Sequence, residues 1–304
     1  MAVPSEVSGM KLYASTQNPT KTQRFVAHVL GLPESKVVCH MKRMGGAFGG
    51  KETRSVFLSC AAAVAAYSLD RPVKLCLDRD VDMAITGQRH AFYGKYTVAA
   101  TKEGVVTALD VKLYSNGGYS LDLSGAVMDR ALFHINNAYQ IPNVRVVGTV
   151  CKTNTSSNTA FRGFGGPQGM IVCETFMEHL AEALSMPVLS LREKNMVSSG
   201  TRLHYGQVME NVELPRVWNE ILATSDYAKR EAEVDRFNKE NRFRKRGLSL
   251  LPTAFGIVRT FPCLTCVHVW GYIDSVYKLL VPIIVRDPVY VLAISMRYCI
   301  TFCV

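Results

Sequence analysis

The feature that most constrains this chain is a glycine-rich stretch near its start, GGAFGGKE at residues 45–52. The stretch follows an apolar run and precedes a segment with the apolar spacing of a helix. Four of residues 45–50 are glycine, which costs backbone entropy on folding unless the conformation needs it. Such loops commonly bring backbone N–H groups against an anion ahead of a helix. A flexible hairpin turn is the alternative interpretation.

The same stretch comes close to the phosphate-binding pattern G-x4-G-K-S/T. Gly45, Gly50 and Lys51 fit the pattern, but Glu52 occupies the position where Ser or Thr would hold magnesium. A carboxylate at this position would repel phosphate oxygens. Glu52 therefore argues against a nucleoside triphosphatase and leaves a P-loop-like nucleotide-binding protein only as a weaker alternative.

A second glycine-rich stretch, FRGFGGP at residues 161–167, also precedes a segment with helical spacing. Two such loops in one chain can place two helix N-termini around one ligand. The dinucleotide-binding pattern G-x-G-x-x-G is absent, because Gln168 follows Gly163 and Gly165 at the last position. A simple turn that caps the following helix is the alternative.

The apolar periodicity predicts a mixture of helices and strands without strict alternation, which indicates an α+β fold. Strands are expected over residues 11–14, 35–43, 72–78, 92–99, 105–116, 144–152 and 248–257. Helices are expected over residues 19–30, from about 52 to 71, after 167, over 189–196 and over 215–246, with a short helical or irregular segment over 128–135. Asn18 and Pro19 are typical of a helix start, and Gly31 is typical of its end.

The composition of the 304 residues, 48% hydrophobic and 20% charged, suits a soluble globular protein. The net charge is +10, and its densest cluster, Arg242 to Arg246, is interpreted as the last turn of a helix ended by Gly247. Only Phe243 accompanies the cluster for stacking, so we expect no nucleic-acid partner. No apolar run reaches the roughly 18 residues of a membrane span. A cytoplasmic protein with no membrane partner is expected.

The character of the sequence changes after Ile257. Residues 258–304 contain four of the nine cysteines and short apolar runs interrupted by Pro282 and Pro288. The sequence therefore predicts a partial domain over residues 1–257 and a hydrophobic tail over 258–304 that is unrelated to it. A zinc site formed by the four tail cysteines is a weak alternative because the two pairs are far apart. The other five cysteines lie in apolar surroundings and are predicted to be reduced and buried.

Five motifs together resemble the molybdopterin-binding region of xanthine dehydrogenase/oxidase, in the molybdenum hydroxylase family. They are STQN at 15–18, GGAFGGKETRS at 45–55, DRALFH at 129–134, NTAFRGFGGPQG at 158–169 and RFNKEN at 236–241. The resemblance extends from about residue 2 to Ile257. It implies an incomplete α+β molybdenum-cofactor-binding domain, in which a pterin dithiolene holds the molybdenum.

The resemblance also implies a role for each matching residue at the cofactor. Gln17 would lie beside the oxo ligand of the molybdenum, as the residue nearest the metal. The backbone around Phe48 and Arg162 would hold the cofactor and its metal. Gly46 and Gly49 would belong to the same cofactor-binding loop. The glycines would then serve to aim N–H groups at an anionic centre.

Three further positions match the substrate pocket of the family. The resemblance implies that Glu52 hydrogen-bonds the ring nitrogens of a purine and that Phe164 packs against its ring. Arg130 would face a purine carbonyl oxygen, where negative charge builds during hydroxylation. Aldehyde oxidases look similar in both loops but usually lack this Glu and this Arg, so the pair points to hypoxanthine and xanthine. A solvated Glu, a surface Arg and a core Phe are the ordinary alternatives.

Full-length members of the family are longer than this chain and form homodimers. The resemblance places their iron–sulfur clusters, their FAD and the general-base glutamate outside this sequence, so no catalytic residue is assigned within it. We therefore expect part of an enzyme that hydroxylates hypoxanthine and xanthine to urate, and we expect the isolated chain to be inactive. The alternative is a non-catalytic truncated product that at most pairs with full-length subunits.

Overall fold

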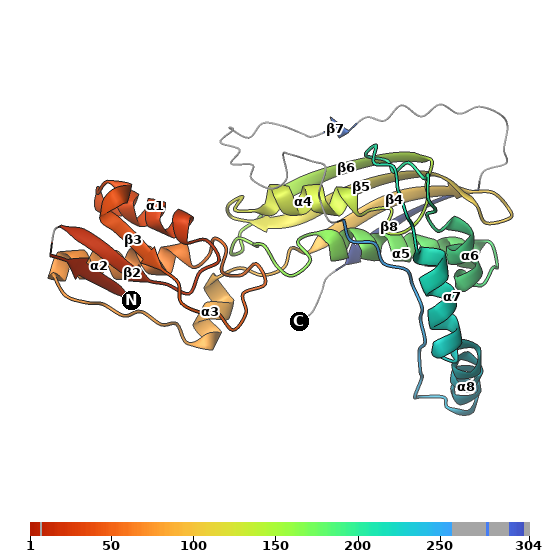
Figure 1. Ribbon diagram of the computed structural model, residues 1–304. Coiled ribbons are helices and arrows are strands. Elements are labelled where there is room, and N and C mark those ends of the chain that lie inside the picture. The colour runs from red at the N-terminus through yellow and green to blue at the C-terminus, as the bar shows by residue number, and fades with distance from the viewer. Residues whose placement is uncertain (7, 257–277, 280–291, 301–304) are drawn as a thin grey trace.

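The computed structural model describes residues 1–6, 8–256, 278–279 and 292–300 (Figure 1). The chain forms two units that lie side by side, each a β-sheet covered by helices (Figure 1). The segment between the units contains the short helix α3 (Arg79–Ile85). Helix and strand are mixed in both units, which confirms the α+β prediction.

The N-terminal unit is a three-stranded sheet in the order β1-β2-β3. Strands β1 (Ala2–Ser5) and β2 (Gly9–Tyr13) are antiparallel, and β3 (Val37–His40) is parallel to β2. Helix α1 (Pro19–Leu30) connects β2 to β3, and α2 (Val56–Leu69) packs beside it. The core between helices and sheet is small and rich in alanine, which allows close packing: Ala2, Met10, Leu12, Val26, Ala27, Val37, Ala62, Ala63 and Ala66.

Helix α1 has the ends that the sequence predicts. The Asn18 side-chain Oδ1 accepts a hydrogen bond from the backbone N–H of Lys21 at 2.9 Å, and Pro19 occupies the first turn. Gly31 ends the helix with φ 65°, in the left-handed region that favours glycine. Helix α2, by contrast, begins at Val56 rather than near Glu52.

The second unit contains a five-stranded sheet in the order β7-β6-β5-β4-β8. Its centre is the antiparallel pair β4 (Phe92–Ala100) and β5 (Val106–Gly118), with β6 (Asn143–Lys152) parallel to β5. The edge strands are β7 (Lys278–Leu279) and β8 (Leu292–Ile300). The β4–β5 hairpin and β6 confirm the strands expected over these residues.

Helices α4 (Ser124–Phe133) and α5 (Gly166–Ala183) cover the same face of this sheet. Gly94 pairs with Leu113, which in turn pairs with Gly148, so the three residues share one face. A Cβ at Gly148 would lie 2.5 Å from the Met128 sulfur of α4, and one at Gly94 would contact Val172 of α5. The two glycines therefore let the helices lie close to the sheet.

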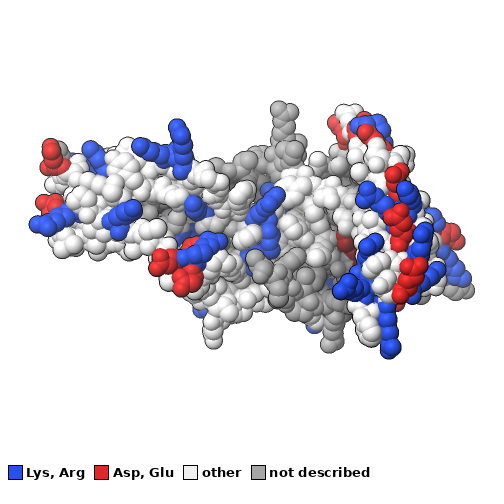
Figure 2. Space-filling view, turned by 90° about the horizontal axis from the view of Figure 1, so that it is seen from below, with Lys and Arg blue, Asp and Glu red and all other residues white. Residues whose placement is uncertain are grey.

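Three more helices complete the second unit: α6 (Val188–Asn195), α7 (Leu214–Thr224) and α8 (Tyr227–Glu240). Side chains of both charge signs are interspersed over α7 and α8 (Figure 2). A single helix over 215–246 is wrong, because Asp226, with φ 51°, separates α7 from α8. The basic cluster is not a helical last turn either: the Arg246 guanidinium lies 4.0 Å from the Phe237 ring centroid, so the chain folds back on α8.

Three other sequence expectations differ from the structure. Residues 72–78 do not form a strand, because only Val73 forms an isolated bridge, to Ala2. Residues 248–256 form no strand, because side chains from other segments hydrogen-bond to their backbone groups. Among the first five cysteines, Cys173 is buried but Cys76 is exposed. All five are free thiols.

The predicted tail over residues 258–304 lies mostly outside the described residues, and so does the proposed cysteine cluster. Its described parts are the edge strands β7 and β8, which pair with β6 and β4. Within the described part of the chain, no helix is both long and apolar enough to cross a membrane.

Candidate functional site

The first glycine-rich loop is built on a tight turn over residues 47–50. The backbone N–H of Gly50 donates to the Ala47 carbonyl at 3.0 Å. The central residues, Phe48 (φ 48°) and Gly49 (φ 98°), both have positive φ, the pattern of a type I′ turn. A bulky side chain rarely adopts this conformation, and such strain concentrates at functional sites.

The second loop contains the same turn over residues 163–166. The N–H of Gly166 donates to the Gly163 carbonyl at 2.9 Å. Phe164 (φ 49°) and Gly165 (φ 97°) repeat the φ values of the first loop almost without change. Here the turn leads directly into α5, which begins at Gly166.

The two loops touch each other. A Cβ at Gly49 would lie 2.5 Å from the Ala160 carbonyl oxygen, so no larger residue fits there without a shift of backbone. The Arg162 guanidinium lies 5.7 Å from the ring centroid of Phe48. The structure therefore joins Phe48, Gly49 and Arg162 at one place, as the sequence predicted from two motifs more than a hundred residues apart.

Gln17 supports the first loop from the end of β2. Its side-chain Oε1 accepts hydrogen bonds from the backbone N–H groups of Gly49 at 3.0 Å and Lys51 at 3.3 Å. Its backbone N–H donates to the Lys51 carbonyl at 2.8 Å. Because the oxygen is used in this way, the Nε2 amide is left as a donor, and it makes no hydrogen bond within the described residues. Gln17 therefore presents an oriented N–H donor beside Phe48.

The arrangement of Lys51 disfavours the P-loop alternative. Its ammonium group donates to the Ser15 hydroxyl at 2.8 Å and so is directed to the loop's own support. Its carbonyl accepts from the hydroxyls of Thr16 and Ser55, each at 3.2 Å. In a P-loop the lysine would reach phosphate oxygens at the start of the following helix, whereas α2 begins only at Val56.

Several backbone N–H groups of the two loops donate to no acceptor within the part of the chain that the structure describes, and those of Phe48 and Arg162 are among them. The Gly49 N–H, by contrast, donates to the Gln17 side chain, and the Gly50 N–H donates to the Ala47 carbonyl. Free N–H groups on strained, glycine-flanked turns are suited to an anionic group. Together with the amide of Gln17, these donors fit a molybdenum–pterin cofactor.

Glu52 is half-buried just after the first turn, and its carboxylate makes no hydrogen bond among the described residues. Burial raises the pKa of Glu52 above its usual value, the negative charge of Asp122 raises it further, and the positive charge of Lys21 opposes the shift. Glu52 is therefore easier to protonate than an ordinary glutamate, because its charged form is partly desolvated and lies near a second negative charge.

Arg130 lies on the second half of α4, and an irregular segment crosses over it. Its Nη1 donates to the Gly256 carbonyl at 3.3 Å, and its guanidinium lies 5.3 Å from the Phe255 ring centroid. The His134 Nε2 accepts from the Gly256 N–H at 3.1 Å, while Nδ1 lies 2.7 Å from the Arg130 carbonyl. We call residues 250–256 the strap. The strap orients Arg130, which the sequence could not show.

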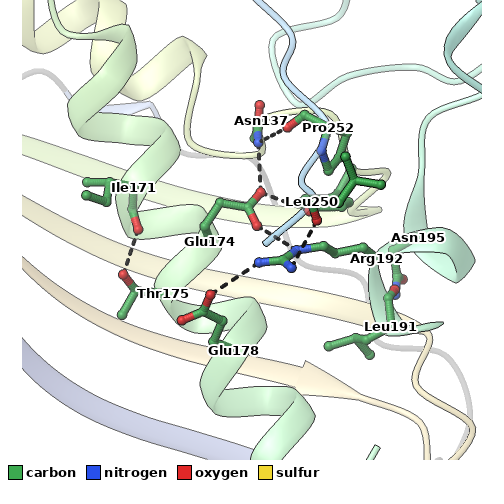
Figure 3. Close-up of polar contacts among 11 residues, drawn as sticks. Asn137, Ile171, Glu174, Thr175, Glu178, Leu191, Arg192, Asn195, Leu250 and Pro252 are labelled. Atoms are coloured by element: carbon green, nitrogen blue, oxygen red, sulfur yellow. Dashed lines mark hydrogen bonds and ion pairs between the residues drawn. The ribbon is translucent and has the colours of Figure 1, made fainter. Parts of the chain in front are cut away.

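A buried polar cluster holds the other end of the strap (Figure 3). Arg192 donates through Nη1 to the Leu250 carbonyl at 3.2 Å and pairs through Nε with Glu174 at 2.9 Å. Asn137 donates to the Glu174 carboxylate and to the Pro252 carbonyl, both at 2.8 Å. The strap's backbone groups are thus satisfied by side chains, which explains why no strand forms here.

Phe164 is partly buried and packs against the hydrophobic core of the second unit. The structure therefore supports the ordinary interpretation of Phe164 as a core residue, and its packing against a purine stays a prediction. Glu52 and Arg130 are not joined by a hydrogen bond or ion pair within the described residues. Glu52 lies near Asp122, just before α4, whereas Arg130 lies six positions beyond Ser124, the first residue of α4, about 9 Å along the helix.

Residues 1–196 match a protein-family model, the molybdopterin cofactor-binding domain. This chain belongs to that family. It is 52% identical over 275 residues to rat (Rattus norvegicus) xanthine dehydrogenase/oxidase and 49% identical over 274 residues to xanthine dehydrogenase of Dictyostelium discoideum. Each alignment covers 89% of this chain. The chain spans about a fifth of the length of these relatives, 21% of the rat protein and 20% of the other.

Solved structures agree with this assignment. Aldehyde oxidoreductase from Desulfovibrio gigas is similar with a TM-score of 0.69 and 29% identity, over 80% of this chain and 26% of that one. CO dehydrogenase from Oligotropha carboxidovorans shares the fold, with a TM-score of 0.69 and 24% identity over 78% of this chain and 30% of that one. The molybdenum-cofactor-binding fold predicted from the sequence is therefore confirmed, within the molybdenum hydroxylases, a family of enzymes.

Two residues of this molybdopterin-binding domain escaped the sequence analysis. Arg89 donates through Nη2 to the Arg162 carbonyl at 2.6 Å and lies 4.6 Å from the Phe161 ring centroid, so it braces the second loop. Asp122 accepts hydroxyl hydrogen bonds from Thr53 and Thr159. Neither residue belongs to a glycine-rich motif, and no local pattern marks them.

Proposed function

We propose that this chain forms one wall of the cofactor and substrate site of a xanthine-oxidising molybdenum hydroxylase. The observation that carries the proposal is the contact between the two glycine-rich loops, where the Phe48 and Arg162 N–H groups and the Gln17 amide have no acceptor among the described residues. These donors would bind the molybdenum–pterin cofactor, with Gln17 nearest the metal. When bound, the cofactor supplies the redox chemistry of the hydroxylation.

Hypoxanthine and xanthine are the proposed substrates. Glu52, whose pKa is raised by burial and by Asp122, would hydrogen-bond the ring nitrogens of the purine. Arg130 would stabilise the negative charge that develops on the purine carbonyl oxygen. Phe164 would pack against the purine ring. This polar pair would discriminate against substrates that leave it unpaired.

The names of the curated relatives support this assignment, and the sequence motifs carry it residue by residue. The iron–sulfur clusters, the FAD and the general-base glutamate belong, on this proposal, to other segments of the full-length enzyme. That enzyme would be a cytoplasmic homodimer with no nucleic-acid or membrane partner. The isolated chain would not turn over xanthine. A non-catalytic product that pairs with full-length subunits is the competing proposal.

A chimera tests the function directly. Residues 1–256 would replace the matching segment of the rat relative, and xanthine oxidation would be measured beside bound molybdenum. We expect the chimera to retain molybdenum and to form urate, while the 304-residue chain alone forms none. In the chimera, Arg130→Met should lower kcat/KM for xanthine by about a hundredfold or more, since one charge-stabilising donor is lost.

Lys112→Gln is the matched control, because Lys112 is an exposed cation on β5 outside both loops. It should leave kcat/KM unchanged. Loss of molybdenum from the chimera would refute the proposed cofactor wall. Retention of molybdenum with oxidation of aldehydes but not of xanthine would refute the proposed substrate. Urate formed by the 304-residue chain loaded with cofactor would refute its inactivity.

A further inference from the structure

Asp122 lies where three separate segments of the candidate site converge. It lies two residues before the start of α4, the helix that carries Arg130. Its Oδ2 accepts hydrogen bonds from the Thr53 hydroxyl at 3.0 Å and from the Thr159 hydroxyl at 2.6 Å. Thr53 follows Glu52 in the first loop, and Thr159 comes three residues before Arg162 in the second.

The distances among the three side chains restrict where the two hydroxyl protons can point. The Thr53 and Thr159 oxygens are 3.3 Å apart, close enough to hydrogen-bond each other. Each hydroxyl has one proton, and both protons are directed to the same carboxylate oxygen. Hydrogen bonds to a charged acceptor are about twice as strong as neutral ones. A single carboxylate oxygen thus connects two loops that have no regular secondary structure in common.

Asp122 itself adopts a restricted backbone conformation, with φ 43°. Asp tolerates the left-handed region better than most residues, but the conformation still has a cost. The cost is consistent with a side chain that must point back at the loops rather than along α4. The backbone N–H of Thr159 is fixed separately, by the Gln88 carbonyl at 3.0 Å.

We propose that Asp122 is the positioning residue that assembles this site, by fixing the first loop, the second loop and the start of α4 in one register. It would set the separation between Glu52, on the first loop, and Arg130, on α4, and it would hold the free N–H groups of Phe48 and Arg162 on the same side. Asp122 itself would touch neither cofactor nor purine. We call the hydrogen bonds from Thr53 and Thr159 to Asp122 the clamp. What the assembled groups bind rests on the proposed function, but the existence of the clamp does not.

Hydrogen exchange of the full 304-residue chain, followed by mass spectrometry, tests the clamp without any cofactor. In Asp122→Ala, we expect amides of residues 45–55 and 158–166 to exchange at least about tenfold faster, because two charge-assisted hydrogen bonds are lost. Thr53→Val and Thr159→Val keep the side-chain shape and should each produce part of the effect. Asp110→Asn is the control. It removes a carboxylate on β5 that pairs with Arg145 on β6, with 3.6 Å between Oδ2 and Nη1, and it belongs to neither loop.

Titration of the Glu52 carboxyl by NMR is a second measurement, and it tests whether Asp122 lies close to Glu52 in the folded protein. Lys21 and Asp122 are the charged groups that act on Glu52. Asp122→Asn removes the repulsive one, so the pKa of Glu52 should fall in that variant and stay unchanged in Asp110→Asn. The clamp is overturned if exchange in both loops matches the wild type, or if it rises equally over the whole chain. It is also overturned if neither threonine variant affects the opposite loop. If the variants of the 304-residue chain behave as expected but the chimera cannot oxidise xanthine, only the proposed function is refuted.

Discussion

The two glycine-rich loops contain the same turn, but different contacts hold each of them in place. Phe48 and Phe164 share one backbone conformation, yet the Phe48 side chain is 66% exposed and Phe164 packs against the core. The first loop is held by polar groups of Gln17 and Lys51, and helix α2 starts several residues later. The second loop runs straight into α5 and rests on α4, where a Cβ at Gly165 would lie 2.0 Å from the Val127 carbonyl oxygen.

This difference shows how one local motif can serve two purposes. The second loop is part of the core of its unit, so its disruption should unfold the protein. The first loop is an attachment whose geometry depends on hydrogen bonds and on contact with its counterpart. Substitutions in it should alter the site while the fold remains.

The largest expected effect is on the pH dependence of the second unit. His90 is buried with Nε2 at 2.6 Å from the Ser124 hydroxyl, and burial lowers its pKa to about 4. Burial also lowers the pKa of His204 to about 4. A histidine whose folded pKa is depressed loses stability as pH falls from its unfolded pKa, near 6.5, towards 4. Between pH 8 and pH 5 the second unit should lose about 2 kcal/mol per histidine.

Urea unfolding followed by the fluorescence of Trp218, a buried residue of α7, would measure this loss in a Trp270→Phe background. His90→Gln has no group to protonate and should show a clearly smaller pH dependence. Equal pH dependence in the two proteins would contradict the assignment of His90 as a buried neutral histidine.

The next effect comes from the glycines. Gly165→Ala forces a methyl group into the Val127 carbonyl and places alanine at φ 97°, so it should destabilise the protein by about 3 kcal/mol. Gly45→Ala meets nothing within 4 Å and should change stability by less than about 0.5 kcal/mol. Urea midpoints of the two variants would show the difference. Similar midpoints would mean that both loops are equally peripheral to folding.

The smallest effect separates the two phenylalanines. Phe164→Ala removes a ring that contacts the core and should cost about 1–2 kcal/mol, less than the value for a fully buried ring. Phe48→Ala removes a mainly exposed ring and should cost under about 0.5 kcal/mol. Thermal melting of the matched pair measures both. A larger cost for Phe48→Ala would show that its contact with Arg162 stabilises the fold.

Local signals in the sequence predicted local structure well. The Asn18 cap, the Gly31 stop and the hairpin between β4 and β5 depend on neighbouring residues, so their patterns are complete within a short window. The expected strand over 248–257 failed for the opposite reason. Its backbone is bound by Asn137, His134 and Arg192, all more than fifty residues away along the chain. The apolar pattern of the segment contains no trace of these partners.

The residues of the candidate site likewise divide into those that local motifs predicted and those that they did not. The motifs predicted Gln17, Phe48 and Arg162 as the residues nearest the metal. In the structure the Arg162 guanidinium lies beside the Phe48 ring and Gln17 binds the backbone of Gly49 and Lys51, while their role at a cofactor stays a prediction. The roles of Glu52, Arg130 and Phe164 in purine binding stay predictions. Asp122 and Arg89 could not be found, because each acts through loops far from it in sequence.

The sequence by itself determined the family, the two glycine-rich loops and the residues assigned to the cofactor and the purine in the proposed function. These depend on residue types and on short spacings along the chain, which a sequence contains in full. Only the tertiary structure decided that each loop contains a strained turn, that the loops touch at Gly49 and Ala160, that a strap covers Arg130, and that one carboxylate at Asp122 joins three segments. Such contacts depend on how separate elements pack against one another, and no single stretch of the chain contains that information.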